Sequence, residues 1–330
     1  MSNAQKKINI AAIAKFVVIA LLIAAAALFA TRKRYYALII GYCGVYAIGI
    51  TGLDLLFGYT GQISFGHAGF FGIGAYTSAL LSKKLAIHPL ITILIGIILA
   101  SIIGMIIAVP ATKLVKHFLS LLTIAFGQII YLIISSAYEI TGGSSGLGSI
   151  PDINLGFIKI DTNIKYAVFI WIIAAITFVI KNNIVNSRVG YAFLAVKENT
   201  VAANGLGVNT RRYKMLAFVL SAAFMALAGG LYAHMVGFIG PDSFNAATSQ
   251  LFMVMLLFGG ICTLEGPIIG AVLLILVREL LQAFANYQVL IYAIFLIAVL
   301  FFFPSGLVGL FKNIAATIGK GVRKNGQGTA

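Results

Sequence analysis

The chain has 330 residues, of which 61% are hydrophobic and only 9% are charged, and its mean hydropathy is +1.05. In a soluble domain about a quarter of the residues are charged, because a polar shell must cover the core. The composition therefore excludes a soluble globular protein, and its hydrophobicity excludes a disordered chain. It predicts an all-α integral membrane protein.

The net charge of +15 does not indicate a nucleic-acid-binding protein, because most basic residues lie in short clusters between long apolar runs. Such clusters are typical of the cytoplasmic loops of membrane proteins. Cys43 and Cys262 lie far apart inside apolar stretches, so the sequence offers no disulfide framework and no cysteine metal site. We expect no metal and no cofactor.

Long apolar runs predict membrane-spanning helices, since a helix needs about 20 residues to cross the hydrocarbon core. The expected spans are 8–30, 35–57, 62–82, 90–110, 117–138, 164–180, 215–236, 248–263, 266–285 and 288–304. A single polytopic bundle of about ten helices thus accounts for residues 1–330. The run 8–30 is longer than a signal-peptide core, so we expect a retained first span, with cleavage as the alternative.

The third run is unusually rich in glycine. Its glycines are Gly58, Gly61, Gly66, Gly69, Gly72 and Gly74. Glycine destabilises a helix by up to about 1 kcal/mol relative to alanine, so the segment 58–82 is expected to be broken or re-entrant. If it crosses the membrane, ten spans place both termini in the cytoplasm, whereas a re-entrant segment leaves nine.

Polar side chains at membrane depth mark the same segment, namely Gln62, Ser64 and His67. Helical spacing would place Ser64 and His67 on one face. Such groups usually face a protein interior or a water-filled cavity, which makes the three residues candidates for the wall of a translocation path. Hydrogen bonds between closely packed helices are the alternative.

Small residues at helical spacing predict tight helix crossings. These packing residues are Gly69 and Gly72 in the third run, and Ala222, Ala226 and Gly230 in the span 215–236. The glycine- and serine-rich stretch 141–148 is expected to be irregular and to lie on the outer side. Thr141 at its start is a further candidate for the translocation path or for contact with an external partner, and a solvated connection is the alternative.

The segment 181–214 is expected to be cytoplasmic, as is the basic tail 305–330, because Lys and Arg dominate its charges. Apolar or small residues follow one another in it at steps of four and three, which predicts a stripe along one short helix over 189–206. The stripe consists of Val189, Phe193, Val196, Thr200 and Ala203. Gly207 can end the helix with a positive φ. The stripe docks in a partner's groove, on the membrane surface or on the bundle itself.

No catalytic constellation is present in the sequence. The histidines have no His, Cys or acidic partner at ligand spacing, and there is no GxxxxGK[ST] phosphate loop. We therefore expect a transport protein rather than an enzyme, whose energy comes from an ion gradient or from another chain. An ion-coupled secondary transporter normally carries carboxylates in the middle of its spans, which are scarce here.

Over residues 35–311 the chain resembles the M-type membrane-spanning subunit of branched-chain amino-acid ABC importers. The motifs that carry the resemblance are GYTGQISFGHAGFFGIGAY at 58–76, LTIAFGQ at 122–128, TGG at 141–143, RYKMLAF at 212–218, AGGLYA at 228–233, GPDSF at 240–244 and FPSGLVG at 303–309. ABC permeases carry a cytoplasmic EAA-x-x-x-G motif that couples to the ATPase. Ala202, Ala203 and Gly207 match it, whereas Val201 stands at the glutamate position and removes a possible salt bridge.

The resemblance implies that Val196, Val201, Ala202, Ala203 and Gly207 take part in coupling to the ATPase. It also implies a complex in the prokaryotic inner membrane, made of this permease, a second similar permease, two cytoplasmic ATPase subunits and an external solute-binding protein. The expected solutes are leucine, isoleucine and valine. A sugar, urea or a short amide is the alternative, because related permeases share this architecture.

Overall fold

The computed structural model describes residues 34–112, 116–154 and 159–281, with a few single residues between 291 and 297. The expected first span 8–30 and the basic tail 305–330 lie outside the described residues, as does nearly all of the span 288–304.

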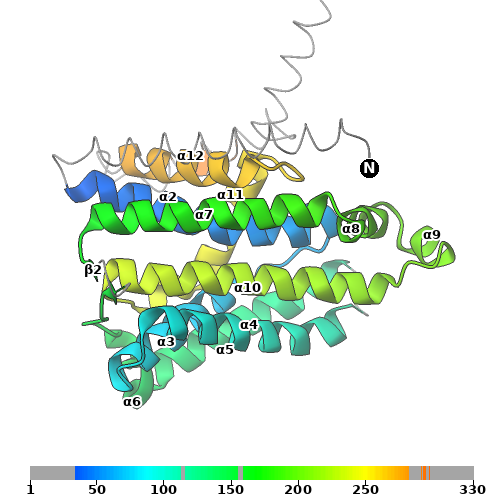
Figure 1. Ribbon diagram of the computed structural model, residues 1–330. Helices are drawn as coiled ribbons and strands as arrows, with labels where there is room; N and C mark the ends of the chain where they lie inside the picture. The colour runs from blue at the N-terminus through cyan, green and yellow to red at the C-terminus, as the bar shows by residue number, and fades with distance from the viewer. Residues whose placement is uncertain are drawn as a thin grey trace, which may run out of the picture.

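Within the described ranges the chain is a bundle of long helices (Figure 1). The helices are α2 (Arg34–Leu53), α3 (His67–Lys84), α4 (Pro89–Ala111), α5 (Lys116–Ser136), α6 (Tyr138–Thr141), α7 (Asn163–Val185), α8 (Arg188–Glu198), α9 (Thr200–Gly205), α10 (Thr210–Val236), α11 (Ala246–Gly259) and α12 (Gly266–Leu281). A π-helical turn η2 (Asp54–Gly58) continues α2, and short 3₁₀ turns η3 (Gly143–Ser145) and η4 (Pro241–Phe244) interrupt the connections. Strands β1 (Ile153–Asn154) and β2 (Lys159–Ile160) form a small antiparallel hairpin.

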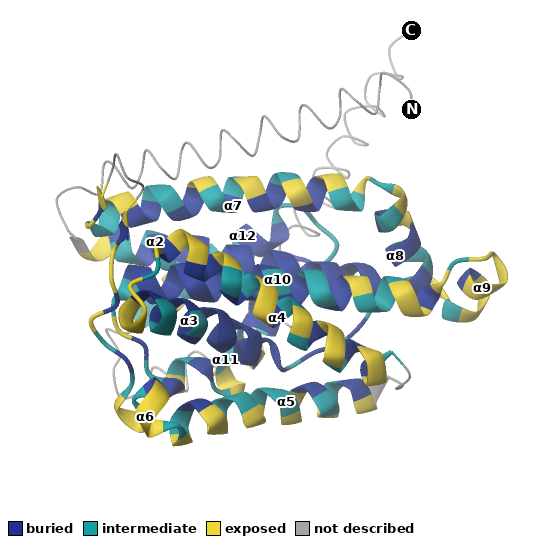
Figure 2. Cartoon of the chain, turned by 60° about the horizontal axis from the view of Figure 1, so that its bottom comes forward, coloured by how far each residue is buried: buried dark blue, intermediate teal, exposed yellow. Residues whose placement is uncertain are grey.

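Five described segments are long and apolar enough to cross a membrane: Tyr35–Gly58, Pro89–Ala111, Phe118–Ser136, Asn163–Val185 and Thr210–Val236. They confirm the prediction of a polytopic helical membrane protein. The outward sides of α4 and α5 expose large apolar residues such as Ile98, Met105 and Leu121, whereas α3 and α10 lie inside the bundle (Figure 2). An exposed apolar face of this extent fits contact with lipid.

The third apolar run is broken. Residues 61–66 are not helical, and α3 begins only at His67, next to Ser221 in the middle of α10. At its other end α3 reaches the connections that follow α5, where Lys83 and Lys84 donate to the backbone carbonyl oxygens of Gly148 and Glu139. Ser64 thus lies before the helix, so the helical spacing that we used to pair it with His67 does not apply.

Two halves of the bundle repeat each other in opposite directions. The sequence GYTGQISF at 58–65 follows α2, and the similar sequence GFIGPDSF at 237–244 follows α10. Both lead into a helix that begins inside the bundle, α3 or α11, and then into α4 or α12. Because α2 and α10 are antiparallel, with Gly41 against Met235 and Gly52 against Phe224, the second half is inverted relative to the first. The shared motif is short, so the repeat becomes evident only from the order and direction of the helices.

The bundle has two distinct ends (Figure 1). At one end lie α6, η3 and the β1–β2 hairpin, which we call the α6 end. At the other end α8 and α9 project from the bundle, and we call it the α9 end. The stretch 141–148, expected to be irregular, contains the turn η3 and left-handed glycines at Gly142, Gly143 and Gly146.

Close helix contacts depend on small residues. Gly74 faces the backbone of Ala226, Gly104 faces Ala222, and Gly230 faces Ile93. Gly69 and Gly72 of α3 lie against α5, where their nearest neighbours include Phe126 and Ile134. The five residues singled out for packing thus all lie at helix crossings.

Replacing Gly229 by alanine tests this packing. Its new Cβ would lie 2.0 Å from the backbone oxygen of Phe71, which cannot move as a side chain can. We expect Gly229→Ala to lower the free energy of unfolding by at least about 1–3 kcal/mol, as overpacking does. Thermal unfolding of the full-length chain in detergent measures the loss.

The matched control is Gly205→Ala in α9, where nothing lies within 4 Å of the added Cβ. Alanine favours a helix over glycine by about 1 kcal/mol, so this variant should unfold at the same or a slightly higher temperature. Equal melting temperatures of the two variants would contradict the packing argument.

Candidate functional site

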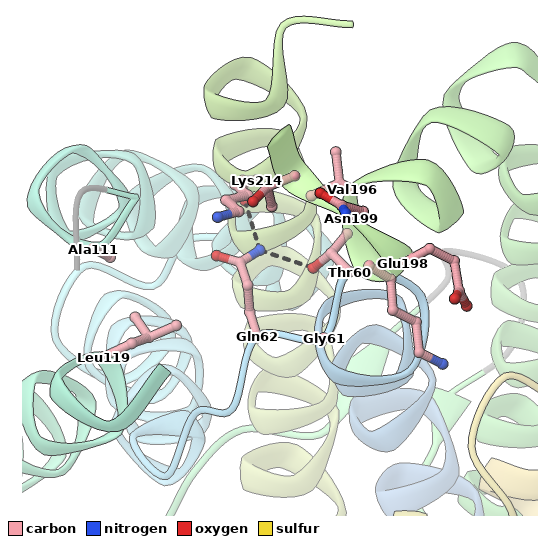
Figure 3. A pocket seen from close by; sticks show the side chains of 11 residues that line it. Thr60, Gly61, Gln62, Ala111, Leu119, Val196, Glu198, Asn199 and Lys214 are labelled. Carbon is pink, nitrogen blue, oxygen red and sulfur yellow. Dashed lines mark hydrogen bonds between the residues drawn. The ribbon is translucent and has the colours of Figure 1, made fainter. Parts of the chain in front are cut away.

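A cavity of about 260 Å³ lies at the α9 end, where the non-helical segment after η2 meets the projecting helices. It is shown in Figure 3 and is called the Gln62 cavity below. Its lining residues are Thr60, Gly61, Gln62, Ala111, Leu119, Val196, Lys197, Glu198, Asn199, Thr200 and Lys214. The structure thus brings one predicted path residue, Gln62, next to one predicted coupling residue, Val196.

Gln62 is held in place at the cavity wall. Its Nε2 donates to Thr60 Oγ1 at 2.8 Å and to the backbone carbonyl oxygen of Lys214 at 3.1 Å. The amide oxygen points to the other side of the cavity, where Ala111 and Leu119 lie (Figure 3). Gln62 therefore presents a hydrogen-bond acceptor to a cavity that polar and apolar side chains line together.

Ser64 and His67 lie deeper and do not line this cavity. His67 is 1% exposed, and its Nδ1 and Nε2 lie 2.9 Å from Ser64 Oγ and 2.7 Å from Ser221 Oγ. A neutral imidazole has one donor and one acceptor nitrogen, so both are used. These bonds fasten the non-helical segment to α10, which is the hydrogen-bonding alternative considered for these residues.

Thr141 lies far from the other candidates, at the α6 end. Its hydroxyl lies 2.6 Å from the carbonyl oxygen of Ile134 and accepts from the Gly143 N–H at 3.1 Å. The side chain is buried and holds the turn that follows α5. The structure does not bring Thr141 together with Gln62, Ser64 or His67.

The predicted single helix over 189–206 is wrong, because it is divided into α8 and α9 at Asn199. Asn199 is extended, with φ −155° and ψ 109°, and its Oδ1 accepts from the backbone N–H groups of Val201 and Ala202. Asparagine is a preferred N-cap residue, so it starts a new helix rather than continuing the first. Gly207 follows α9 with φ +83°, as expected for a residue that ends a helix.

The apolar stripe mostly packs on the chain itself. Phe193, Val196 and Ala203 are buried, and the Phe193 ring stacks edge-on to Tyr213 of α10 at 6.2 Å. Val196 and Ala203, predicted as coupling residues, are therefore internal packing residues in this conformation. The outward surface of α9 instead carries Val201, 79% exposed, and Leu206, 85% exposed. Ala202 and Gly207 also lie on the exposed surface, and Figure 2 shows α9 standing away from the bundle.

A fully buried ion pair lies near this site. Lys181 Nζ is 2.7 Å from Asp54 Oδ2, and both side chains are 0% exposed. Asp54 Oδ1 accepts from the Cys262 backbone N–H at 2.9 Å, while Lys181 also donates to the carbonyl oxygen of Thr263 at 2.8 Å. The pair joins the π-helical turn after α2, helix α7 and the α11–α12 connection. Buried charges need such partners, because an isolated charge in a low-dielectric interior is very costly.

Helix α8 is bonded to the same region through Cys262. Lys197 Nζ donates to Cys262 Sγ at 3.1 Å, and this thiol in turn donates to the Gly58 carbonyl oxygen at 2.8 Å. Burial raises the pKa of the Cys262 thiol, although the neighbouring Lys197 opposes the shift, so the thiol keeps the proton that it donates. A continuous set of polar contacts thus runs from α8 to the buried ion pair.

Sequence reasoning missed this pair. We placed Lys181 in a cytoplasmic loop and Asp54 merely near the end of a span, but α7 continues to Val185 and encloses Lys181. The sequence did offer one indication of the pair: two opposite charges, each near the C-terminal end of a long apolar run. Within the described ranges, no group of three or more His, Cys, Asp or Glu residues could hold a metal ion.

Breaking the ion pair should destabilise the protein strongly. We expect Lys181→Met or Asp54→Asn alone to lower the free energy of unfolding by about 3–5 kcal/mol, because each leaves a buried partner uncompensated. The double variant should lose less than the sum of the two, and thermal unfolding of the full-length chain measures all three. Strictly additive losses would show that the two side chains do not stabilise each other.

Comparison with known proteins identifies the relatives of this chain. The family model described as "Branched-chain amino acid transport system / permease component" matches residues 35–303. The high-affinity branched-chain amino acid transport system permease protein LivM of Escherichia coli K12 is 30% identical over 81% of this chain and 68% of its own length. A probable LivM of Methanocaldococcus jannaschii is 25% identical over 82% of this chain and 92% of its own length.

The second type of permease in these systems is also similar. The E. coli K12 protein LivH is 28% identical over 80% of this chain and 91% of its own length. No solved structure matches the chain. The family consists of transport subunits rather than enzymes. Because the family model covers most of the sequence, the chain belongs to the family of permease components of branched-chain amino acid transport systems.

Proposed function

We propose that this protein is a membrane-spanning subunit of an ATP-driven importer of branched-chain amino acids in a prokaryotic inner membrane. The observation that carries the proposal is the family match over 35–303, supported by relatives whose names state this solute class. The sequence has no phosphate loop, so ATP hydrolysis belongs to other subunits.

The proposed complex contains a second permease, two cytoplasmic ATPase subunits and an external solute-binding protein. Similarity to both LivM and LivH supports a pair of related permeases. The α9 end is assigned to the cytoplasm, because its exposed residues include Arg188, Arg211 and Arg212. The α6 end then faces the binding protein, and ten spans return both termini to the cytoplasm.

Helix α9 is the proposed contact with an ATPase subunit. It projects from the bundle and exposes Val201 and Leu206, two apolar side chains that a partner's groove would cover. Val201 takes the glutamate position of the ABC coupling motif, so this contact relies on apolar burial rather than on a salt bridge. Ala202 and Gly207 lie on the same exposed segment.

Motion of α9 reaches the spans through α8. Phe193 and Val196 anchor α8 in the bundle, and Lys197 connects it to Cys262 and the Asp54–Lys181 pair. A displacement of α8 therefore acts on α2, α7 and the α11–α12 connection together, as a rigid-body switch between two states requires. Gln62 lies beside α8 and is the proposed path residue at this end. Ser64 and His67 support the segment that carries it, whereas Thr141 holds the turn after α5 at the opposite end.

Charged substitutions on α9 test the coupling proposal. We expect Leu206→Asp to reduce ATP-driven leucine uptake by the reconstituted complex at least about tenfold, since burying the carboxylate at the contact costs more than about 1.4 kcal/mol. Membrane insertion and the stability of the permease should not change, because the Leu206 side chain is 85% exposed.

The control is Leu85→Asp, which alters another exposed leucine, 63% exposed, between α3 and α4 at the opposite end. It should leave ATP-driven uptake near the wild-type rate. Wild-type uptake by the Leu206 variant, or uptake by the permease without any ATPase, would refute the proposed coupling.

The solute is tested separately by co-expressing the chain with its genomic neighbours and purifying the complex. We expect two ATPase subunits and a binding protein that retains leucine, isoleucine or valine, as mass spectrometry of the released ligand would show. A binding protein loaded with a sugar, urea or a short amide would overturn the solute assignment while leaving the ABC class intact.

A further inference from the structure

A second and larger cavity, of about 480 Å³, lies between α2, α10, α11 and α12, at the side of η4. Its volume falls in the range of about 300–1,000 Å³ that is typical of small-molecule sites. Four tyrosines line it, Tyr35, Tyr42, Tyr46 and Tyr232, and we call it the tyrosine cavity. None of the path residues predicted from the sequence belongs to it.

The tyrosine cavity is related to the Gln62 cavity by the inverted repeat. The Gln62 cavity is lined by the turn before α3, the start of α10 and the end of α4. The tyrosine cavity is lined by the turn before α11, the start of α2 and the end of α12. The two cavities are therefore equivalent positions of the two halves, and each lies toward its own end of the bundle.

Charged groups of both signs border the tyrosine cavity. Arg278 and Glu279 come from the end of α12, and Asp242 comes from η4. Arg278 shares the lining of the cavity with Tyr42 and Tyr46. The Tyr131 hydroxyl donates to Asp242 Oδ1 at 3.5 Å. Arginine suits a carboxylate, because its planar group can donate two parallel hydrogen bonds.

Tyrosine rings form the middle of the cavity. The ring centroids of Tyr42 lie 6.2 Å from Tyr46 and 5.9 Å from Tyr232, and the Tyr232 hydroxyl donates to Ser243 Oγ at 3.3 Å. Aromatic faces attract an ammonium group, and the hydroxyls can accept its hydrogen bonds. Ammonium and carboxylate groups of one small molecule thus both find partners here.

Apolar side chains complete the wall. They are Leu38, Ile39, Leu251, Met255, Leu274 and Ile275. Ile39, Met255 and Leu274 are buried, so the apolar part of the cavity lies inside the bundle. Arg278 and Asp242 are exposed and stand at its mouth. This arrangement places charges outside and an aliphatic pocket inside.

We propose that the tyrosine cavity binds one free α-amino acid with an aliphatic side chain, an inference that rests on the proposed function and adds a binding site in this subunit. Arg278 holds the α-carboxylate, Asp242 and the tyrosines hold the α-ammonium group, and the apolar wall takes the side chain. The tyrosine cavity lies toward the α6 end, opposite to the Gln62 cavity. Because the α6 end is assigned to the external side, the cavity receives the solute where the binding protein releases it.

Protection of an introduced cysteine tests the site. The complete importer carrying Ser243→Cys is reconstituted in nanodiscs without the binding protein and treated with a membrane-impermeant thiol reagent. We expect millimolar leucine to slow modification at least about threefold. Isocaproate, which lacks the ammonium group, and isoamylamine, which lacks the carboxylate, should give no protection. The importer with only its native Cys43 and Cys262 measures the background.

Two further variants make the result specific. Ser144→Cys, exposed at the α6 end outside the cavity, should react at the same rate with and without leucine. Adding Arg278→Gln or Asp242→Asn to Ser243→Cys should abolish the protection by leucine. Equal protection at Ser144→Cys would indicate a general conformational change and would overturn the proposal. Protection that survives both charge substitutions would overturn it as well.

Failure of this inference is distinguishable from failure of the proposed function. If the wild-type importer takes up leucine but leucine does not protect Ser243→Cys, the cavity is not the binding site, and the function stands. The same result is expected if a zwitterionic lipid headgroup occupies the cavity, since leucine would not displace it. If the wild-type importer does not take up leucine at all, the proposed function itself fails.

Discussion

The constraint on which the structure depends is that a chain inside a lipid bilayer must satisfy its polar groups internally, because no water is available in the hydrocarbon. The non-helical segment before α3 meets this requirement through side chains of neighbouring helices. The Phe65 N–H donates to Thr123 Oγ1, and the Ala68 N–H at the start of α3 donates to Ser249 Oγ of α11. His67 adds bonds to Ser64 and Ser221. Irregular backbone is thus possible at this depth only because it is enclosed by protein.

The bond between Ala68 and Ser249 also shows where the two inverted halves meet. Helices α3 and α11 both start inside the bundle and run toward opposite ends. Each therefore leaves open space before its first residue, between that residue and the end of the bundle that the helix does not reach. The Gln62 cavity and the tyrosine cavity occupy these two places. A repeat of this kind is common in transporters, where it provides equivalent positions that open to opposite sides of the membrane. Close packing of Gly74 on Ala226 holds α3 directly against α10.

Sequence reasoning predicted the class of fold well, because the runs that became α2, α4, α5, α7 and α10 are long and apolar. It also indicated the break before α3 from the glycine content of 58–74. It did not predict that the segment 189–206 is divided into two helices at Asn199. The apolar periodicity continues across this residue, but the Asn199 side chain caps a new helix there. The Asp54–Lys181 pair and the tyrosine cavity join residues far apart in the chain, so only the packing of the helices brings them together.

The position of the buried ion pair supports the proposal that the small projecting helix α9 acts on the bundle through α8. Lys181 and Asp54 are held by the backbone at Cys262 and Thr263, and Cys262 has a left-handed backbone with φ +56°. Separating the two charges in this setting would expose each to a low-dielectric interior, which is far more costly than moving the joined elements as one unit. In the proposed coupling, the η2 turn, α7 and the α11–α12 connection would therefore move together with α8. We therefore propose that this polar network, rather than apolar packing alone, would carry a displacement of α8 to both halves of the inverted repeat.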